Sequence, residues 1–127
     1  MSKRRVVVTG MGIVSPVGND IATAWKNVLE GNSGIGPVTA FDASAYATRI
    51  AGEVRDFDPV EAYFVGSDAP DDERRAIDKD FKRMDPFIHY GIVAGTHALR
   101  QAGLVVTDEN AGRIGIAAGA GIGGLHT

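Results

Sequence analysis

The sequence of 127 residues contains no cysteine, and this absence limits the chemistry available to the chain. Without thiols these residues can form neither a disulfide nor a thiolate metal site, and they hold no cysteine nucleophile. A strong charge of either sign is also missing, because the formal net charge is only -3. No global basic field therefore indicates a nucleic-acid partner.

Long apolar runs are missing as well. The basic start of the chain is followed by only three valines, Val6 to Val8, whereas a signal peptide needs an apolar region of roughly 7–15 residues. No run approaches the roughly 20 apolar residues of a membrane-spanning helix. Hydrophobic residues make up 44% of the chain, which is typical of a globular protein. We therefore expect a cytoplasmic protein.

Two short apolar segments predict strands of a buried parallel sheet. Residues 5–9 include three consecutive valines, and residues 113–118 are apolar after their first arginine. Segments that are apolar on both faces are typical of central parallel strands. Helical patterns separate the two segments, so the predicted fold class is α/β. Two strands cannot cover the apolar faces of these helices, and we expect residues 1–127 to be a piece of a larger fold.

The first half of the chain predicts one helix and one short strand. The helix is expected over residues 21–30, with Asn19 or Asp20 as its N-cap. Its apolar residues recur at helical spacing, and this pattern places Trp25 on the buried face. Residues 44–54 look extended, and we expect one short strand there.

The second half of the chain predicts two helices. Acidic residues after a proline favour a helix over residues 71–84, which we expect to be exposed. The longest helix is expected over residues 86–102 and ends at Gly103, and small residues on its wide apolar face predict deep burial. His89 and His97 lie eight residues apart on this helix, without further ligand-type residues at a suitable spacing. We expect each to meet a polar partner rather than a metal ion.

A glycine-rich segment follows each of the two strands predicted for the parallel sheet. Residues 119–124 match the G-x-G-x-x-G pattern of dinucleotide-binding loops, and residues 10–15 match it with serine as the final residue. That motif needs a helix that begins within it, and the proline at position 16 delays the helix in the first segment. The second segment is compatible with nucleotide binding, with an oxyanion or acyl-pocket loop, or with a simple tight turn.

Three cations gather at the end of the helix expected over residues 71–84, namely Lys79, Lys82 and Arg83. Cations at a helix C-terminus complement the helix dipole, and this explanation alone accounts for them. The alternative is a small docking patch for an acidic partner. Residue chemistry by itself favours the dipole explanation.

Five motifs along the chain, in the same order, resemble the β-ketoacyl-acyl-carrier-protein synthases, the condensing enzymes of fatty-acid synthesis. The likeness covers nearly the whole chain, and Ile122 favours the type II elongating enzymes among them. The motifs are RRVVVTGMGIVSPVGN (residues 4–19), GNSGI (31–35), FDASAYATRIAGEV (41–54), KRMDPFIHYG (82–91) and RIGIAAGAGIGGL (113–125).

The resemblance implies a thiolase-like fold with α-β-α-β-α layers, of which this chain supplies the N-terminal part of the N-terminal domain, with a charged excursion at about residues 64–84. It also implies a homodimeric acyltransferase that elongates fatty acids by decarboxylating Claisen condensation of malonyl-carrier protein with acyl-carrier protein. That chemistry needs no nicotinamide and no metal. The family's catalytic cysteine, histidines and lysine are expected after Thr127, because His89, His97 and His126 do not match them.

Few residues of this chain match functional positions of the family. Gly121 and Ile122 match the loop that lines the acyl pocket, where the isoleucine side chain acts as a gate on chain length. Lys79, Lys82 and Arg83 match positions that dock the acidic carrier protein, so the resemblance favours docking over the dipole explanation. Two alternatives remain: a nucleotide-binding α/β module that uses the glycine-rich loops, and a non-catalytic fragment that needs a partner half.

The segment from Phe64 to Ala76 departs from the resemblance, because it is longer and more acidic than its counterpart in the family. Acids beside a docking patch are expected to weaken carrier binding or to change its specificity. We also expect the isolated chain to expose much of its long helix, and to aggregate or to form a molten globule.

Overall fold

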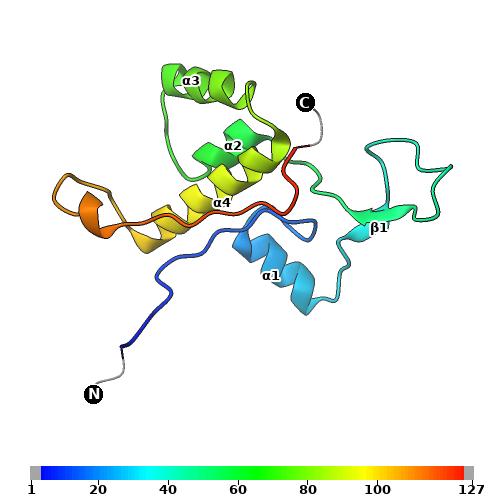
Figure 1. Cartoon of the computed structure of the whole chain (residues 1–127), viewed down its shortest axis with the longest axis horizontal. Helices are drawn as coiled ribbons and strands as arrows, with labels where there is room; N and C mark the ends of the chain where they lie inside the picture. The colour runs from blue at the N-terminus through cyan, green and yellow to red at the C-terminus, as the bar shows by residue number, and fades with distance from the viewer. Residues whose placement is uncertain (1–3, 125–127) are drawn as a thin grey trace.

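The structure is a computed structural model that describes residues 4–124. In this part of the chain α4 lies at the centre, with α2 and α3 on one side of it and α1 on the other (Figure 1). The elements are α1 (Ile21–Leu29), β1 (Ile35–Pro37), β2 (Ile50–Gly52), α2 (Pro59–Phe64), α3 (Asp71–Phe81), α4 (Pro86–Ala102) and a short 3-10 helix (Ala111–Arg113).

Local signals set the ends of α1 where the sequence predicts them. The Asp20 carboxylate caps the helix by accepting hydrogen bonds from the Thr23 amide at 2.9 Å and the Thr23 hydroxyl at 2.7 Å. The hydroxyl contributes most to lowering the pKa of Asp20. Gly31, with φ of 72°, follows the helix in the left-handed conformation. The prediction that Trp25 is buried is wrong, because its side chain is 61% exposed and Ala24 is the buried residue of this helix.

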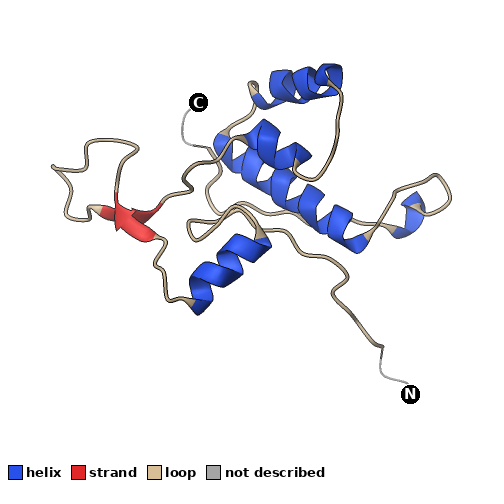
Figure 2. Cartoon of the chain, turned by 180° about the vertical axis from the view of Figure 1, so that it is seen from behind, coloured by secondary structure: helices blue, strands red, loops and turns tan. Residues whose placement is uncertain are grey.

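The two strands form a short antiparallel hairpin that projects away from the helices (Figure 2). β2 confirms the single strand expected within residues 44–54. At the base of the hairpin the Glu53 carboxylate accepts hydrogen bonds from the amides of Thr39 and Ala40 and from the Thr39 hydroxyl. The Thr39 amide contributes most to lowering the pKa of Glu53 to about 2.

The prediction of strands at residues 5–9 and 113–118 is wrong within the residues that the structure describes. Residues 5–9 and 114–118 have no regular secondary structure and pair with no other described segment. Arg113 is the last residue of the 3-10 helix. Val6 and Ile116 are each 93% exposed. The physical reason is that a strand exists only through hydrogen bonds to a neighbour, and neither segment is paired with another strand here.

Two glycines hold the N-terminal segment against α4. A Cβ on Gly12 would collide with the carbonyl oxygen of Ala94, and a Cβ on Gly10 would collide with that of Ala98. The alanines allow the approach from the other side, because they place no long side chain between the two backbones. α4 is therefore packed closely against residues 10–12.

Burial of α4 is shallower than the sequence predicts. Val93 is its one fully buried residue, whereas Phe87 and Leu99 are 38% and 44% exposed. The segment at residues 10–12 covers only one side of the helix, where the Met11 amide also donates to the Gln101 Oε1 at 2.6 Å. The helix is thus packed on some sides and open on others.

The remaining helix bounds follow the sequence closely, with one addition. α4 ends at Gly103, which has a φ of 61° as expected for a left-handed cap. α3 begins at Asp71 as predicted but ends at Phe81, earlier than the expected Met84. The short helix α2, which packs on both α3 and α4, was not expected. No helix among the described residues is both long and apolar enough to span a membrane.

Candidate functional site

The three cations predicted to dock a carrier lie together at the junction of α3 and α4. Lys79 occupies the last turn of α3, and Lys82 follows as its C-cap with helical angles of -60° and -12°. The Arg83 amide donates to the Asp80 carbonyl at 3.0 Å, which continues the turn. Residues three or four positions apart on a helix are surface neighbours, and all three cations are exposed. We call Lys79, Lys82 and Arg83 the basic patch.

One member of the basic patch has a partner on its own helix. The Lys82 Nζ lies 2.5 Å from the Asp78 Oδ2, one turn earlier. Among residues 4–124, neither Lys79 nor Arg83 forms an ion pair. The patch is therefore uneven, with one cation neutralised by a neighbouring carboxylate and two cations that are not.

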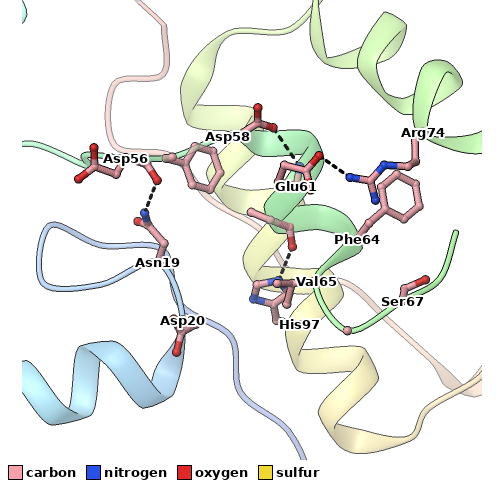
Figure 3. Close-up of a pocket in the computed structure, with 13 residues that line it drawn as sticks. Asn19, Asp20, Asp56, Asp58, Glu61, Phe64, Val65, Ser67, Arg74 and His97 are labelled. Atoms are coloured by element: carbon pink, nitrogen blue, oxygen red, sulfur yellow. Dashed lines mark hydrogen bonds and ion pairs between the residues drawn. The ribbon is translucent and has the colours of Figure 1, made fainter. Parts of the chain in front are cut away.

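Contacts with α2 fix the position of α3 and hence of the basic patch. The Arg74 guanidinium lies 2.5 Å from the Glu61 carboxylate and 5.1 Å from the centre of the Phe64 ring (Figure 3). The hydrogen bond to Glu61 is the main cause of a raised pKa for Arg74. At the other end of α3 the buried Phe81 ring packs edge-on to Tyr63 at 6.0 Å. An ion pair and an aromatic contact therefore anchor both ends of α3.

The two histidines of α4 are held by backbone carbonyls. The Nε2 of His89 lies 2.9 Å from the Phe81 carbonyl oxygen, and the Nε2 of His97 lies 2.7 Å from that of Ala62. Because a carbonyl oxygen only accepts, each Nε2 carries the hydrogen and donates it. The prediction of a polar partner for each histidine is confirmed. No group of three or more His, Cys, Asp or Glu side chains within residues 4–124 is placed to hold a metal ion.

An apolar trough of about 550 Å³ runs between α4 and the C-terminal segment, residues 116–120. Gly91 and Gly95 lie on the trough side of α4, and no atom approaches the position of a Cβ on either. Their missing side chains keep the space between helix and segment open. Larger apolar residues also line this open trough, namely Phe87, Ile88, Ile92, Leu99 and Ile116.

The predicted acyl-pocket residues lie just beyond this trough. Its lining ends at Ala120, so neither Gly121 nor Ile122 contributes to its walls. The Ile122 side chain is 81% exposed, and the space around Gly121 is open. The structure therefore places both residues at the trough end, with the isoleucine side chain in solvent.

The loop after Ile122 returns to the first turn of α4. Gly123 adopts a φ of 78° and lies against the Phe87 ring, and a Cβ on Gly124 would collide with the Asp85 carboxylate. Asp85 directly follows the turn that carries Lys82 and Arg83. The glycine loop and the basic patch consequently meet at the same end of α4, although they lie some forty positions apart in the sequence.

A second hollow, of about 450 Å³, lies among α1, α2 and α4 and is rich in acids (Figure 3). Three of the four carboxylates that line it have a structural partner. Asp20 caps α1, Asp58 caps α2 by accepting from the amides of Val60 and Glu61, and Glu61 binds Arg74. These acids hold helix ends and the α2–α3 contact, so their hydrogen-bonding capacity serves the fold.

Comparison with known proteins identifies the family. The model of the beta-ketoacyl synthase N-terminal domain matches residues 3–127. The chain belongs to the beta-ketoacyl synthase family. The family resemblance predicted from the five motifs is therefore confirmed.

Curated relatives within the beta-ketoacyl synthases carry the name 3-oxoacyl-[acyl-carrier-protein] synthase 2. The protein from Vibrio harveyi is 52% identical over 98% of this chain, that from Vibrio cholerae 51% over 99%, and that from Synechocystis 43% over 98%. In each case the matched region is 27% of the relative's length. The chain thus spans about a quarter of the curated relatives that it matches.

A solved ketosynthase structure confirms the fold class. The ishigamide ketosynthase/chain length factor aligns with a TM-score of 0.60 and 30% sequence identity. The alignment covers 82% of this chain and 23% of that one. Both the sequence identity and the structural similarity therefore support the predicted fold class. The chain is the N-terminal region of a thiolase-like α/β ketosynthase fold.

The beta-ketoacyl synthase chain also holds features that sequence reasoning missed. The trough glycines Gly91 and Gly95 were overlooked, although their i, i+4 spacing between Phe87 and Leu99 is a readable sign of a grooved helix face. Arg74, which anchors α3, is one cation among several in a charged segment, and nothing in the sequence distinguishes it. His126, which was compared with the family's histidines, lies outside the described residues.

Proposed function

We propose that this chain forms the carrier-docking and acyl-pocket region of a condensing enzyme that elongates fatty acids. The reaction is a decarboxylating Claisen condensation of malonyl-carrier protein with acyl-carrier protein. The observation that carries the proposal is the 52% identity to a 3-oxoacyl-[acyl-carrier-protein] synthase 2 over 98% of the chain. Assembly as a homodimer and a cytoplasmic location remain predictions.

The catalytic step is not assigned to these residues. An acyl chain is transferred from a carrier to such an enzyme as a thioester, and forming a thioester needs a thiolate on the enzyme. The sequence has no cysteine. His89 and His97 are committed to backbone carbonyls through Nε2, so neither is arranged as a free acid or base. We therefore assign binding roles alone to residues 4–124.

The trough is the feature that suits an acyl chain. Its walls are largely apolar, and a chain of methylene groups gains free energy in proportion to the apolar area that leaves water. Gly121 and Ile122 directly follow the last lining residue of the trough, so one end of a bound chain would lie beside them. We propose that the Ile122 side chain limits chain length there, as the family resemblance implies.

The basic patch is proposed to dock the acidic carrier protein. Its three cations are exposed, fixed by helix geometry and adjacent to the loop that follows Ile122. Charge complementarity of this kind raises the association rate and sets orientation more than it adds affinity. A carrier bound at the patch would present its acyl group near the end of α4 at which the trough opens.

Charge reversal at one lysine tests docking, and the chain offers a closely matched control. Lys82 and Lys26 each form an exposed i, i+4 ion pair, with Asp78 and Glu30 respectively. We expect Lys82→Glu to raise the Kd for holo acyl carrier protein on the order of tenfold at low salt, and Lys26→Glu to leave it unchanged. Fluorescence anisotropy with labelled carrier and the full-length chain measures both. Equal effects of the two substitutions would contradict docking at the patch.

The alternative of a nucleotide-binding module receives no support from the geometry. The G-x-G-x-x-G motif binds pyrophosphate at the N-terminus of a helix that begins inside it. Residues 119–124 are extended with a bend, and no helix begins in this segment as far as the structure describes it. The first glycine motif is followed by a helix only at Ile21.

A further inference from the structure

The ion pair between Asp78 and Lys82 places an acid inside the surface that is proposed to receive an acidic partner. The two charged groups are 2.5 Å apart, and their side chains are 43% and 71% exposed. Both groups therefore remain in contact with water, so the pair can open and close without disturbing the fold. An incoming carboxylate would have to take the place of Asp78 at the Lys82 ammonium.

The other acids near Asp78 do not have this relation to the basic patch. A shallow polar hollow brings Asp78 beside Asp58, Glu61 and Asp71. Asp58 caps α2 and Glu61 binds Arg74, so both face the α2–α3 contact. Among the residues described, Asp78 is the acid that forms an ion pair with a member of the basic patch.

We propose that Asp78 is a specificity-determining residue that lowers the affinity of the basic patch for acidic carrier proteins. The inference rests on the proposed docking function and adds that Asp78 competes with carrier carboxylates for Lys82. Asp78 acts in two ways: it occupies Lys82, and it repels carboxylates that approach Lys82. Lys79 and Arg83 are not occupied in this way. The patch consequently favours carriers whose acids face Lys79 and Arg83 over carriers whose acids face Lys82.

Neutralising Asp78 tests the proposal. Asp78→Asn keeps the size and helical position of the side chain while removing its charge. At low salt we expect it to lower the Kd for labelled holo acyl carrier protein roughly twofold to fourfold, a range suited to exposed charge pairs. The matched control is Asp72→Asn, which removes the same charge from the first turn of α3, where no ion pair with the patch is found. We expect this control to leave the Kd unchanged.

Salt and a double-mutant cycle separate the mechanism from a change in helix stability. Screening should abolish the gain from Asp78→Asn at about 1 M salt, where the Debye length is about 3 Å. The gain should also shrink in a Lys82→Ala background, because the competition acts through that ammonium group. A gain that persists at high salt, or that is as large without Lys82, overturns the proposal.

The outcomes distinguish this inference from the function on which it rests. If Lys82→Glu weakens carrier binding while Asp78→Asn leaves it unchanged, docking stands and the role of Asp78 is refuted. If neither substitution changes the Kd, the docking proposal fails and the inference fails with it. Tighter binding by Asp78→Asn together with weaker binding by Lys82→Glu supports both.

Discussion

Two glycine-rich segments run beside α4, and their glycines have opposite roles. At residues 10–12 the glycines touch the α4 backbone, and any Cβ there would strike a carbonyl oxygen. At residues 119–121 the space around the glycines is open, and the neighbouring helix contributes two more open glycines, Gly91 and Gly95. The first segment needs glycine for contact, whereas the second keeps a trough free.

The difference shows that glycine content does not itself indicate a ligand site. The same residue type allows close contact with a helix backbone at Gly12 and lines an open apolar trough at Gly95. What separates them is whether a backbone or an empty space lies opposite. Adding one methyl group at a time tests this separation.

The largest effect is expected at Gly12. Its Cβ would meet the Ala94 carbonyl, which belongs to helix backbone and cannot rotate away, so Gly12→Ala forces the segment and α4 apart. We expect a loss of about 3 kcal/mol in the free energy of unfolding, at the upper end of overpacking costs. Urea unfolding of the full-length chain followed by circular dichroism measures this loss. A change below about 0.5 kcal/mol, the scale of ordinary surface substitutions, would remove the contrast between the segments.

A smaller effect is expected at Gly124, where the obstacle is a side chain. A Cβ there meets the Asp85 carboxylate, which can rotate, so Gly124→Ala should cost about 1–2 kcal/mol of stability. Combination with Asp85→Ala should recover most of that loss, because the two changes share one contact. Additive losses in the double variant would show that the loop does not rest on Asp85.

The smallest effect, and one of opposite sign, is expected at Gly95. Alanine is favoured over glycine inside a helix by about 1 kcal/mol, and the structure leaves room for its methyl group. Gly95→Ala should therefore raise the free energy of unfolding by about 0.5–1 kcal/mol, while its methyl group narrows the trough and weakens binding of a fluorescent fatty acid. Gly112→Ala is the control, since Gly112 lies in the 3-10 helix outside the trough lining with room for a methyl group, and it should leave fatty-acid binding unchanged. Stabilisation with unchanged fatty-acid binding would argue against the trough as an acyl site.

Helix ends were predictable from the sequence because their signals are local. Asp20 caps α1 through a residue three positions away, and Gly103 ends α4 through its own backbone angle. The basic patch was predictable for the same reason, since helical spacing alone brings Lys79 beside Lys82 and Arg83. The short helix α2 was not predictable from periodicity, because six residues are too few for a periodic pattern. Asp58 and the proline after it do mark its start.

Features that depend on distant partners were not predictable in this way. Residues 5–9 have the composition of a strand, but a strand requires a paired neighbour. Trp25 has the spacing of a core residue, but burial requires another element over that face. The trough arises between α4 and a segment that follows it by many residues, so no local pattern describes it. The acyl role of Ile122 stays a prediction for the same reason, because its side chain points into solvent here.

The contact between residues 10–12 and α4 also bears on the order in which the chain folds. The hydrogen bond from the Met11 amide to Gln101 joins residues 90 positions apart. α4 can form from its own sequence within microseconds, whereas closing so long a loop carries an entropic cost that local contacts do not repay. The N-terminal segment therefore docks on α4 late. During synthesis Met11 cannot make this contact until Gln101, 90 positions later, has left the ribosome.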